Sequence, residues 1–206
     1  MTRADIINTF IQKRGFKSYL EIGVDRHECF DAVKAKIKES VDPNPQACPT
    51  HLMYSDEFWK KNTEKYDIIF IDGLHHGDQV YRDILGAIKH TARNDSVVVL
   101  HDCNPPNVIA GRHNLKDFNK GGWNGDVWTG FTYYRLHSPY LCYTVDTDEG
   151  CGVIDLSATT QKIELPQNIW NIYNTVKPED VCYLSYELLN DYRTELLGLV
   201  GGIIYE

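Results

Sequence analysis

The chain has 206 residues, of which 42% are hydrophobic and 24% are charged, and this composition excludes a disordered chain and a collagen-like repeat. No apolar run in it approaches the roughly 18–20 residues of a transmembrane helix, and its N-terminal sequence lacks the features of a signal peptide. The formal charge of −8 argues against a nucleic acid as partner, because phosphate binding requires a basic face. We therefore expect a cytoplasmic protein that binds neither membranes nor nucleic acids.

Six cysteines are scattered along the chain without any C-x-x-C pair. They are Cys29, Cys48, Cys103, Cys142, Cys151 and Cys182. A zinc site built from thiolates normally shows ligand pairs at short spacing, so these thiols are not expected to bind zinc. In the cytoplasm they would remain reduced.

Hydrophobic periodicity predicts helices that alternate with strands. The expected helices lie at residues 5–14, at 27–39, from about 77 onward, at 126–136 and at 178–200. The expected strands lie at residues 19–24, 40–43, 51–53, 66–72, 97–100, 141–145 and 152–155. Because such alternation implies right-handed βαβ units, we expect an α/β protein with a doubly wound sheet.

Three further features concern caps, loops and domain organisation. Asp25 is the expected N-cap of the helix at 27–39. Residues 107–125 are rich in Asn, Gly and His and are typical of a long active-site loop. No linker or repeat divides the chain, so we expect one domain over residues 1–206, with a helical tail from 166 to 206 packed on its core.

Polar residues follow the strands at the ends where a doubly wound sheet binds its ligands. They are Glu21, Gly23, Asp42, Asp72, His75, His101 and Asp102. Gly23 allows a ligand to approach the backbone closely, and Asp42 could accept hydrogen bonds from ribose hydroxyls. The G-x-G-x-x-G pattern of NAD- and FAD-binding proteins is absent after Gly23, which weighs against those cofactors.

Several stretches resemble the class I S-adenosylmethionine-dependent methyltransferases, namely YLEIGV, VDPNP, YDIIFIDGLHHGDQVYRDI and VVVLHDCNPP. Two others, WNGDVW and VDTDEGCGVI, are similar to a bacterial branch of that family associated with the modification of sugars. The resemblance covers residues 19–155. It implies a Rossmann-like, seven-stranded mixed sheet whose last strand is antiparallel.

The same resemblance implies how S-adenosylmethionine would bind. The cofactor would lie over Gly23, with its ribose on Asp42 and its methionine portion near Glu21. The adenine would lie near Ser55 and Asp56, and Asp72 is a further candidate for contact with the cofactor.

The D-G-L-H sequence also resembles that of metal-dependent macrolide-sugar O-methyltransferases. Matched residue by residue, Asp72 and Asp102 would bind a divalent metal and His75 would be the catalytic base, with Asp72 part of the catalytic pair. His101 stands where that family has a carboxylate. Imidazole is a poor ligand for magnesium and a better one for manganese, iron or zinc, so the identity of the metal stays open, with magnesium or manganese as the candidates.

The acceptor is expected at the loop that follows the fifth strand. Trp123 and Asp126 are the candidate contacts, because an exposed tryptophan beside polar groups suits a sugar ring. Core packing is the competing interpretation for Trp128. The aromatic residues of the tail, Trp170 and Tyr173 among them, are assigned to packing or to a subunit contact, which leaves a homo-oligomer open.

Each candidate residue also has a purely structural interpretation. Gly23 could serve only a turn, Asp42 and Asp102 could cap turns before prolines, His75 or its neighbour could begin a helix, and His101 could tether a loop. We predict a methyltransferase that acts on a hydroxyl of a saccharide or another small molecule. The alternatives are an NAD-dependent oxidoreductase and a non-catalytic protein that binds an S-adenosyl ligand.

Overall fold

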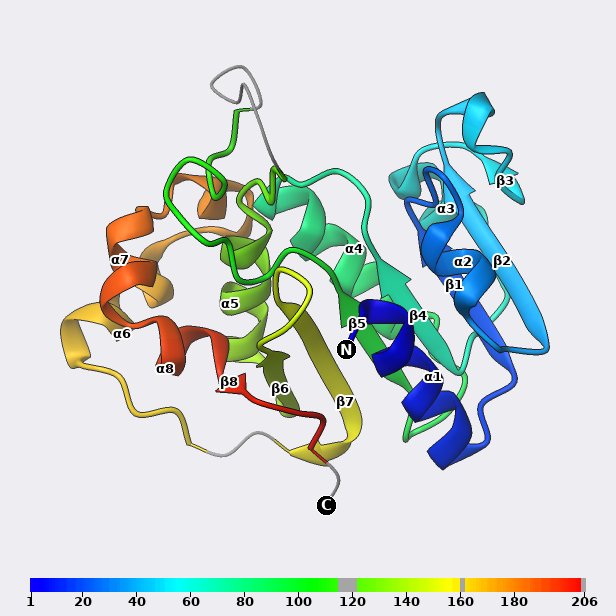
Figure 1. Ribbon diagram of the computed structural model, residues 1–206. Coiled ribbons are helices and arrows are strands. Elements are labelled where there is room, and N and C mark those ends of the chain that lie inside the picture. The colour runs from blue at the N-terminus through cyan, green and yellow to red at the C-terminus, as the bar shows by residue number, and fades with distance from the viewer. Residues whose placement is uncertain (115–121, 160–161, 205–206) are drawn as a thin grey trace.

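The protein is described by a computed structural model that covers residues 1–114, 122–159 and 162–204. Its strands form one sheet with the order β3-β2-β1-β4-β5-β7-β6-β8 (Figure 1). The strands are β1 (Ser18–Ile22), β2 (Ile37–Asp42), β3 (His51–Leu52), β4 (Ile68–Ile71), β5 (Val97–Leu100), β6 (Tyr140–Val145), β7 (Cys151–Thr159) and β8 (Leu199–Val200).

Among the described strands, only β7 runs antiparallel to its neighbours β5 and β6. The predicted α/β mixed sheet with an antiparallel seventh strand is therefore confirmed. The sheet has one more strand than expected, because the two-residue β8 pairs with β6 at the edge.

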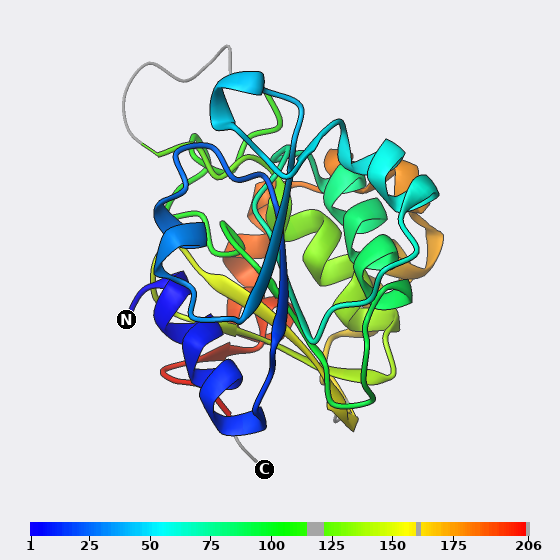
Figure 2. The same ribbon diagram turned by 90° about the vertical axis from the view of Figure 1, so that its right-hand side faces the viewer.

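Helices cover both faces of the sheet (Figure 2). α1 (Arg3–Arg14) and α2 (Glu28–Ala32) lie on one face, while α3 (Ser55–Lys61), α4 (Gly77–Lys89) and α5 (Val127–His137) lie on the other. The C-terminal helices pack beside α5 on that second face (Figure 1). They are α6 (Gln167–Thr175), the 3-10 helix η3 (Pro178–Tyr183), α7 (Tyr186–Asp191) and α8 (Arg193–Leu197), and a further 3-10 turn, η1, spans Pro45–Ala47.

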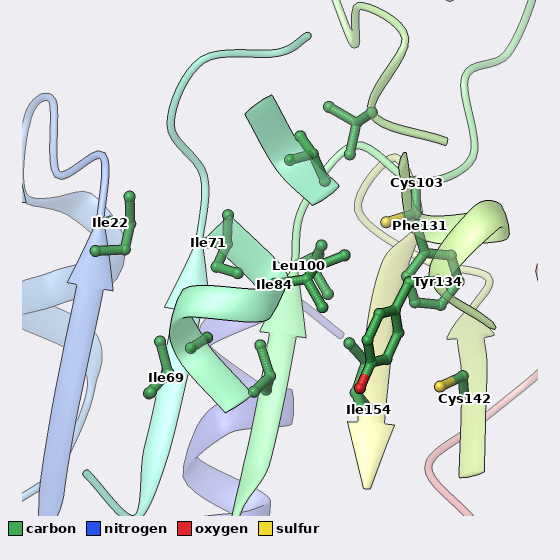
Figure 3. Close-up of a cluster of buried hydrophobic side chains, with 14 of the residues drawn as sticks. Ile22, Ile69, Ile71, Ile84, Leu100, Cys103, Phe131, Tyr134, Cys142 and Ile154 are labelled. Atoms are coloured by element: carbon green, nitrogen blue, oxygen red, sulfur yellow. The ribbon is translucent and has the colours of Figure 1, made fainter. Parts of the chain in front are cut away.

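Alternate strand residues enter two separate hydrophobic cores, because successive side chains of a strand point to opposite faces. Figure 3 shows Ile71 and Leu100 beside Ile84 of α4, in the core that also contains Ile69 and Phe131 of α5. The core on the other face contains Tyr19, Ile68, Phe70, Val97 and Val99, together with Ile6, Ile7 and Phe10 of α1. Burial on both faces explains why β4 and β5 consist only of apolar residues.

Two of the predicted helices are wrong in extent. The helix expected at 27–39 ends after five residues, because residues 37–42 pair with β1 as a strand. Its N-cap is His27 rather than Asp25. The helix expected at 178–200 is split into η3, α7 and α8, since Ser185 caps a new helix and Gly198 ends the last one in a left-handed conformation.

None of the helices in the described ranges combines the length and the apolar character that a membrane span requires.

A buried ion pair joins α1 to β7. The guanidinium of Arg14 donates to both carboxylate oxygens of Asp155, at 2.8 and 2.5 Å, and the Asp155 side chain is only 3% exposed. Burial alone would raise the pKa of Asp155, but hydrogen bonds from Arg14 and Ser157 lower it. The pair therefore stabilises the fold above the ordinary pKa of an aspartate, and this contribution is lost as the pH falls.

We expect Arg14→Ala to lower the free energy of unfolding by roughly 3–5 kcal/mol at neutral pH, because it leaves a buried carboxylate without its cation. Urea denaturation would measure this loss. The difference from the wild type should shrink in acid, where protonation removes the charge of Asp155, and it should be smaller in an Asp155→Asn background. An equal loss in both backgrounds would mean that packing of the Arg14 side chain, not the ion pair, stabilises the contact.

Candidate active site

The carboxyl ends of β1, β2, β4 and β5 surround one cavity of about 830 Å³. The strand order reverses between β1 and β4, which is the point where sheets of this kind bind ligands. All but one of the predicted site residues line this cavity: Glu21, Gly23, Asp42, Ser55, Asp56, Asp72, His75, His101, Asp102 and Trp123.

Gly23 lies where β1 and β4 approach most closely. Its φ is +84°, a conformation that residues with a side chain rarely adopt. A Cβ atom at this position would overlap the backbone carbonyl of Asp72. The close approach of β1 and β4 therefore requires a glycine at position 23, whether or not a ligand binds in the cavity beside it.

Asp42, at the end of β2, holds the loop that follows β1. Its Oδ2 accepts hydrogen bonds from the backbone N–H groups of Val24 (3.1 Å) and Asp25 (3.3 Å), and its Oδ1 accepts one from Asn44 (2.8 Å). The turn-capping interpretation of Asp42 is therefore confirmed. Because the carboxylate also lines the cavity, it remains available to a ligand there.

Glu21 is almost fully buried at the base of the cavity, and its carboxyl accepts a hydrogen bond from the Tyr19 hydroxyl. Burial raises the pKa of Glu21 to about 8, and the charge of Asp72 adds to the rise. The group is therefore largely protonated at neutral pH. A cationic ligand beside it would favour the ionised carboxylate.

His75 lies between two carboxylates. Its Nε2 is 3.4 Å from Oδ1 of Asp72 and 3.3 Å from Oδ2 of Asp102, while its Nδ1 donates to the carbonyl of Trp123 at 2.8 Å. Burial alone would lower the pKa of His75, but the hydrogen bond to Asp72 and the two negative charges raise it to about 9. The ring is therefore a cation at neutral pH, held by three acceptors.

The two carboxylates differ in their other partners. Burial alone would raise the pKa of Asp72, but the hydrogen bond from His75 and nearby positive charge lower it. Asp102 adopts a left-handed conformation with φ +60°, and its Oδ1 accepts a hydrogen bond from the Asn124 side chain at 2.7 Å. Asp72 is thus held in the ionised form that binds cations, and Asp102 is held in place beside it.

His101 is tied to the N-terminal helix. Nη1 of Arg3 lies 2.6 Å from its Nε2, and because a guanidinium can only donate, Nε2 must accept. The ring proton then lies on Nδ1, which faces Oδ2 of Asp102 at 3.0 Å. His101 therefore contacts the N-terminal helix, whereas the expected tether was to the loop at 103–125. A ring nitrogen of His101 also lies within 4.8 Å of carboxylate oxygens of Asp72 and Asp102.

Ser55 and Asp56, in the first turn of α3, close the opposite side of the cavity. The side-chain amide of Gln79, from α4, donates to Ser55 Oγ and Asp56 Oδ1, each at 3.2 Å. Gln79 therefore connects the two helices where both reach the cavity.

Trp123 lies beside His75, with the two rings stacked at a centroid distance of 5.4 Å. Asp126, by contrast, does not line the cavity. Its side chain is buried, accepts from the N–H of Gly77 at 3.1 Å and pairs with His113. The expected contact of Asp126 with the acceptor is therefore corrected.

Several other residues that the sequence analysis singled out lie away from the cavity. Trp128 is 1% exposed and belongs to the core, and Trp170 and Tyr173 pack in a smaller hydrophobic cluster beneath the C-terminal helices. His76 is the N-cap of α4. Residues 115–121 of the expected active-site loop lie outside the described residues.

Sequence reasoning missed Arg3, Asn124, Asp148 and Glu149. Arg3, Asp148 and Glu149 line the cavity, and Asn124 donates both to Asp102 and to Glu149. Asp148 and Glu149 could have been found, because they form an acidic turn just before Gly150, between two predicted strands. No local signal marks Arg3, because it reaches His101 across 98 positions of sequence.

The chain is similar in sequence and in fold to known methyltransferases. Residues 13–103 match a protein family described as a methyltransferase domain, whereas no curated protein matches the chain. A methyltransferase of Podospora anserina bound to S-adenosylhomocysteine is 12% identical, with a TM-score of 0.59 over 77% of this chain and 78% of its own.

Two further solved structures have the same fold. An amino pentose methyltransferase of Micromonospora echinaspora, involved in calicheamicin biosynthesis and bound to S-adenosylmethionine, is 12% identical, with a TM-score of 0.55 over 74% of this chain and 89% of its own. An O-methyltransferase of Streptomyces achromogenes, involved in tomaymycin synthesis, is 14% identical, with a TM-score of 0.51 over 77% and 80%.

At these identities the solved structures establish a shared fold. The chain thus has the fold of these methyltransferases, and its residues 13–103 match the methyltransferase-domain family.

We expect Gly23→Ala to lower the free energy of unfolding by at least about 2 kcal/mol, because it combines a left-handed conformation with overlap against the Asp72 carbonyl. Urea denaturation measures the effect. Gly201→Ala is the matched control, since a Cβ there meets nothing within 4 Å, and its effect should stay within about 0.5 kcal/mol. Equal stability of the two variants would show that β1 and β4 can separate at this point without loss.

Proposed function

We propose that this protein transfers the methyl group of S-adenosylmethionine to a hydroxyl oxygen of a saccharide or another small molecule. The observation that carries the proposal is the position of His75 and the Asp72–Asp102 pair. These groups form one wall of the same cavity whose other walls contain Gly23 and Asp42. A proton acceptor and a cofactor subsite thus share one ligand-sized space.

The cofactor subsite is proposed at the ends of β1 and β2. Asp42 would accept the ribose hydroxyls, Glu21 would face the cationic methionine portion, and Ser55 and Asp56 would contact the adenine. The burial of Glu21 and Asp42 and the Gln79 contacts to α3 support this arrangement, because they fix each polar group in place.

The acceptor subsite is proposed at the opposite wall, between Trp123 and the acidic residues Asp148 and Glu149. An aromatic face together with carboxylate acceptors suits a polyhydroxylated ring. Methyl transfer from a sulfonium requires an aligned nucleophile and removal of its proton. His75 would take that proton on Nε2 in its neutral form, which a cation bound at Asp72 and Asp102 would favour, and the bond from its Nδ1 to the Trp123 carbonyl fixes the ring for this role.

The residues present fit a divalent cation at Asp72 and Asp102. Their carboxyl groups lie on neighbouring strand ends, and oxygen ligands are what magnesium and manganese accept. His101 fits less well, since Arg3 keeps the proton on the ring nitrogen that faces Asp102. When bound, a divalent cation would neutralise the two carboxylates, which favours neutral His75, and would stabilise the developing alkoxide.

The proposed cofactor subsite predicts that Asp42→Ala weakens binding of S-adenosylhomocysteine by tenfold or more, since each hydrogen bond to a charged group contributes about 1–3 kcal/mol. Calorimetric titration measures the affinity. Asp31→Ala is the matched control, because Asp31 is exposed and does not line the cavity. Unchanged affinity in a folded Asp42→Ala protein would rule out the ribose contact.

His75, Asp72 and Asp102 form the proposed catalytic wall of the cavity. If these roles are correct, Asp72→Asn and Asp102→Asn abolish methyl transfer but retain S-adenosylhomocysteine binding. Transfer of a radioactive methyl group to a panel of sugars and phenols measures the activity. Excess chelator should abolish transfer by the wild type in the same way. Added magnesium or manganese should then restore the activity of the wild type but not that of the two variants. His75→Ala should lower turnover by roughly 10²–10⁴-fold.

Two results would contradict these roles. Full activity in excess chelator would remove the metal from the reaction and leave Asp72 and Asp102 as partners of His75. Full activity of His75→Ala would remove the histidine as base. Asp31→Asn, at an exposed position outside the cavity, should behave as the wild type in both assays.

A further inference from the structure

A second cluster of metal-ligating side chains lies outside the cavity. It consists of His113, in the loop after β5, Asp126, the N-cap of α5, and Cys182, in η3. One donor atom from each lies within 4.8 Å of the other two. None of the three residues lines the active-site cavity, so the cluster is separate from the Asp72–Asp102 pair.

The donor types match the preferences of zinc. Thiolate, imidazole and carboxylate are its three protein ligands, at about 2.0–2.3 Å. Ligands of a tetrahedral ion at those distances lie about 3.3–3.8 Å apart. Nδ1 of His113 lies 3.0 and 3.2 Å from the two oxygens of Asp126, slightly closer than two ligands of one ion. The Cys182 donor lies within 4.8 Å of both residues, so it must approach them by up to about 1 Å to enclose the ion.

The surroundings of Asp126 also favour a cation. The residue is 2% exposed, and burial of a carboxylate is costly unless a positive charge compensates it. The N–H of Gly77 donates to Asp126 Oδ1 at 3.1 Å and orients the carboxylate, as outer-shell groups do for metal ligands.

The aromatic packing around His113 restricts its ring. His76 stacks on it at a centroid distance of 4.0 Å. The residue before it, Arg112, accepts a hydrogen bond on its carbonyl from Trp123 Nε1 at 2.8 Å. The cluster is therefore connected, through one residue, to the aromatic wall of the active-site cavity.

We propose that His113, Asp126 and Cys182 bind one Zn²⁺ ion. The ion joins the C-terminal segment to the loop after β5 and to the start of α5, and through Arg112 it holds Trp123 at the cavity. A water molecule takes the fourth position, since three protein ligands leave one open. This proposal departs from the sequence-based expectation that these thiols do not bind zinc.

Titration of the full-length, chelator-treated protein with Co²⁺ tests the site, because a thiolate bound to Co²⁺ gives an intense near-ultraviolet charge-transfer absorption. We expect this absorption to saturate at one equivalent and to disappear when one equivalent of Zn²⁺ is added. Cys182→Ser should abolish it. His113→Asn should weaken Zn²⁺ binding by at least about tenfold, as loss of even an outer-shell partner does at metal sites.

Two control variants show whether the absorption arises at Cys182 or elsewhere in the protein. Cys48→Ser removes an exposed cysteine outside the cluster and should retain the absorption, as should Asp102→Asn, which alters the catalytic wall. S-adenosylhomocysteine binding by Cys182→Ser would show that this variant is folded. Absence of the charge-transfer band in the wild type, or its persistence in Cys182→Ser, would overturn the proposal whatever the outcome of the methyl-transfer assays.

Discussion

Two carboxylates at neighbouring strand ends, Asp72 and Asp102, set the main electrostatic constraint on this protein. Held close together in a partly buried setting, they repel each other unless positive charge and hydrogen-bond donors surround them. His75 supplies a cation between them, and Asn124 supplies a neutral donor. The negative charge of Asp72 and Asp102 therefore favours a bound cation and also raises the pKa of His75.

Segments far apart in the chain come together around the Asp72–Asp102 pair. The N-terminal helix brings Arg3 to His101, and the turn between β6 and β7 anchors Arg3 through Asp148. On the other side, Gly77 and Gly130 allow the starts of α4 and α5 to touch, because a Cβ on either would overlap the other helix. That close contact positions His75 and Trp123 over the cavity, so the outer helices contribute to the site as well as to stability.

Much of the sheet could be read from local patterns. The apolar runs around β4 and β5 can only be buried on both faces, so their assignment follows from hydrophobicity alone. Parallel strands place their carboxyl ends at one edge, and the polar residues at those ends therefore had to converge. For that reason Gly23, Asp42, Asp72, His75 and Asp102 were found without a structure, although their chemical roles stay predictions.

Other features depended on contacts that no local pattern encodes. By itself the sequence determined the alternating strands and helices, the polar strand ends and the resemblance that points to methyl transfer. The tertiary structure decided that residues 37–39 join β2 instead of extending a helix, that Asp126 lies outside the cavity, and that Cys182 meets His113. The physical reason is range: periodicity and turn chemistry act over a few residues, whereas strand pairing, the burial of charge and ligand clusters are set by residues that only the folded chain brings together.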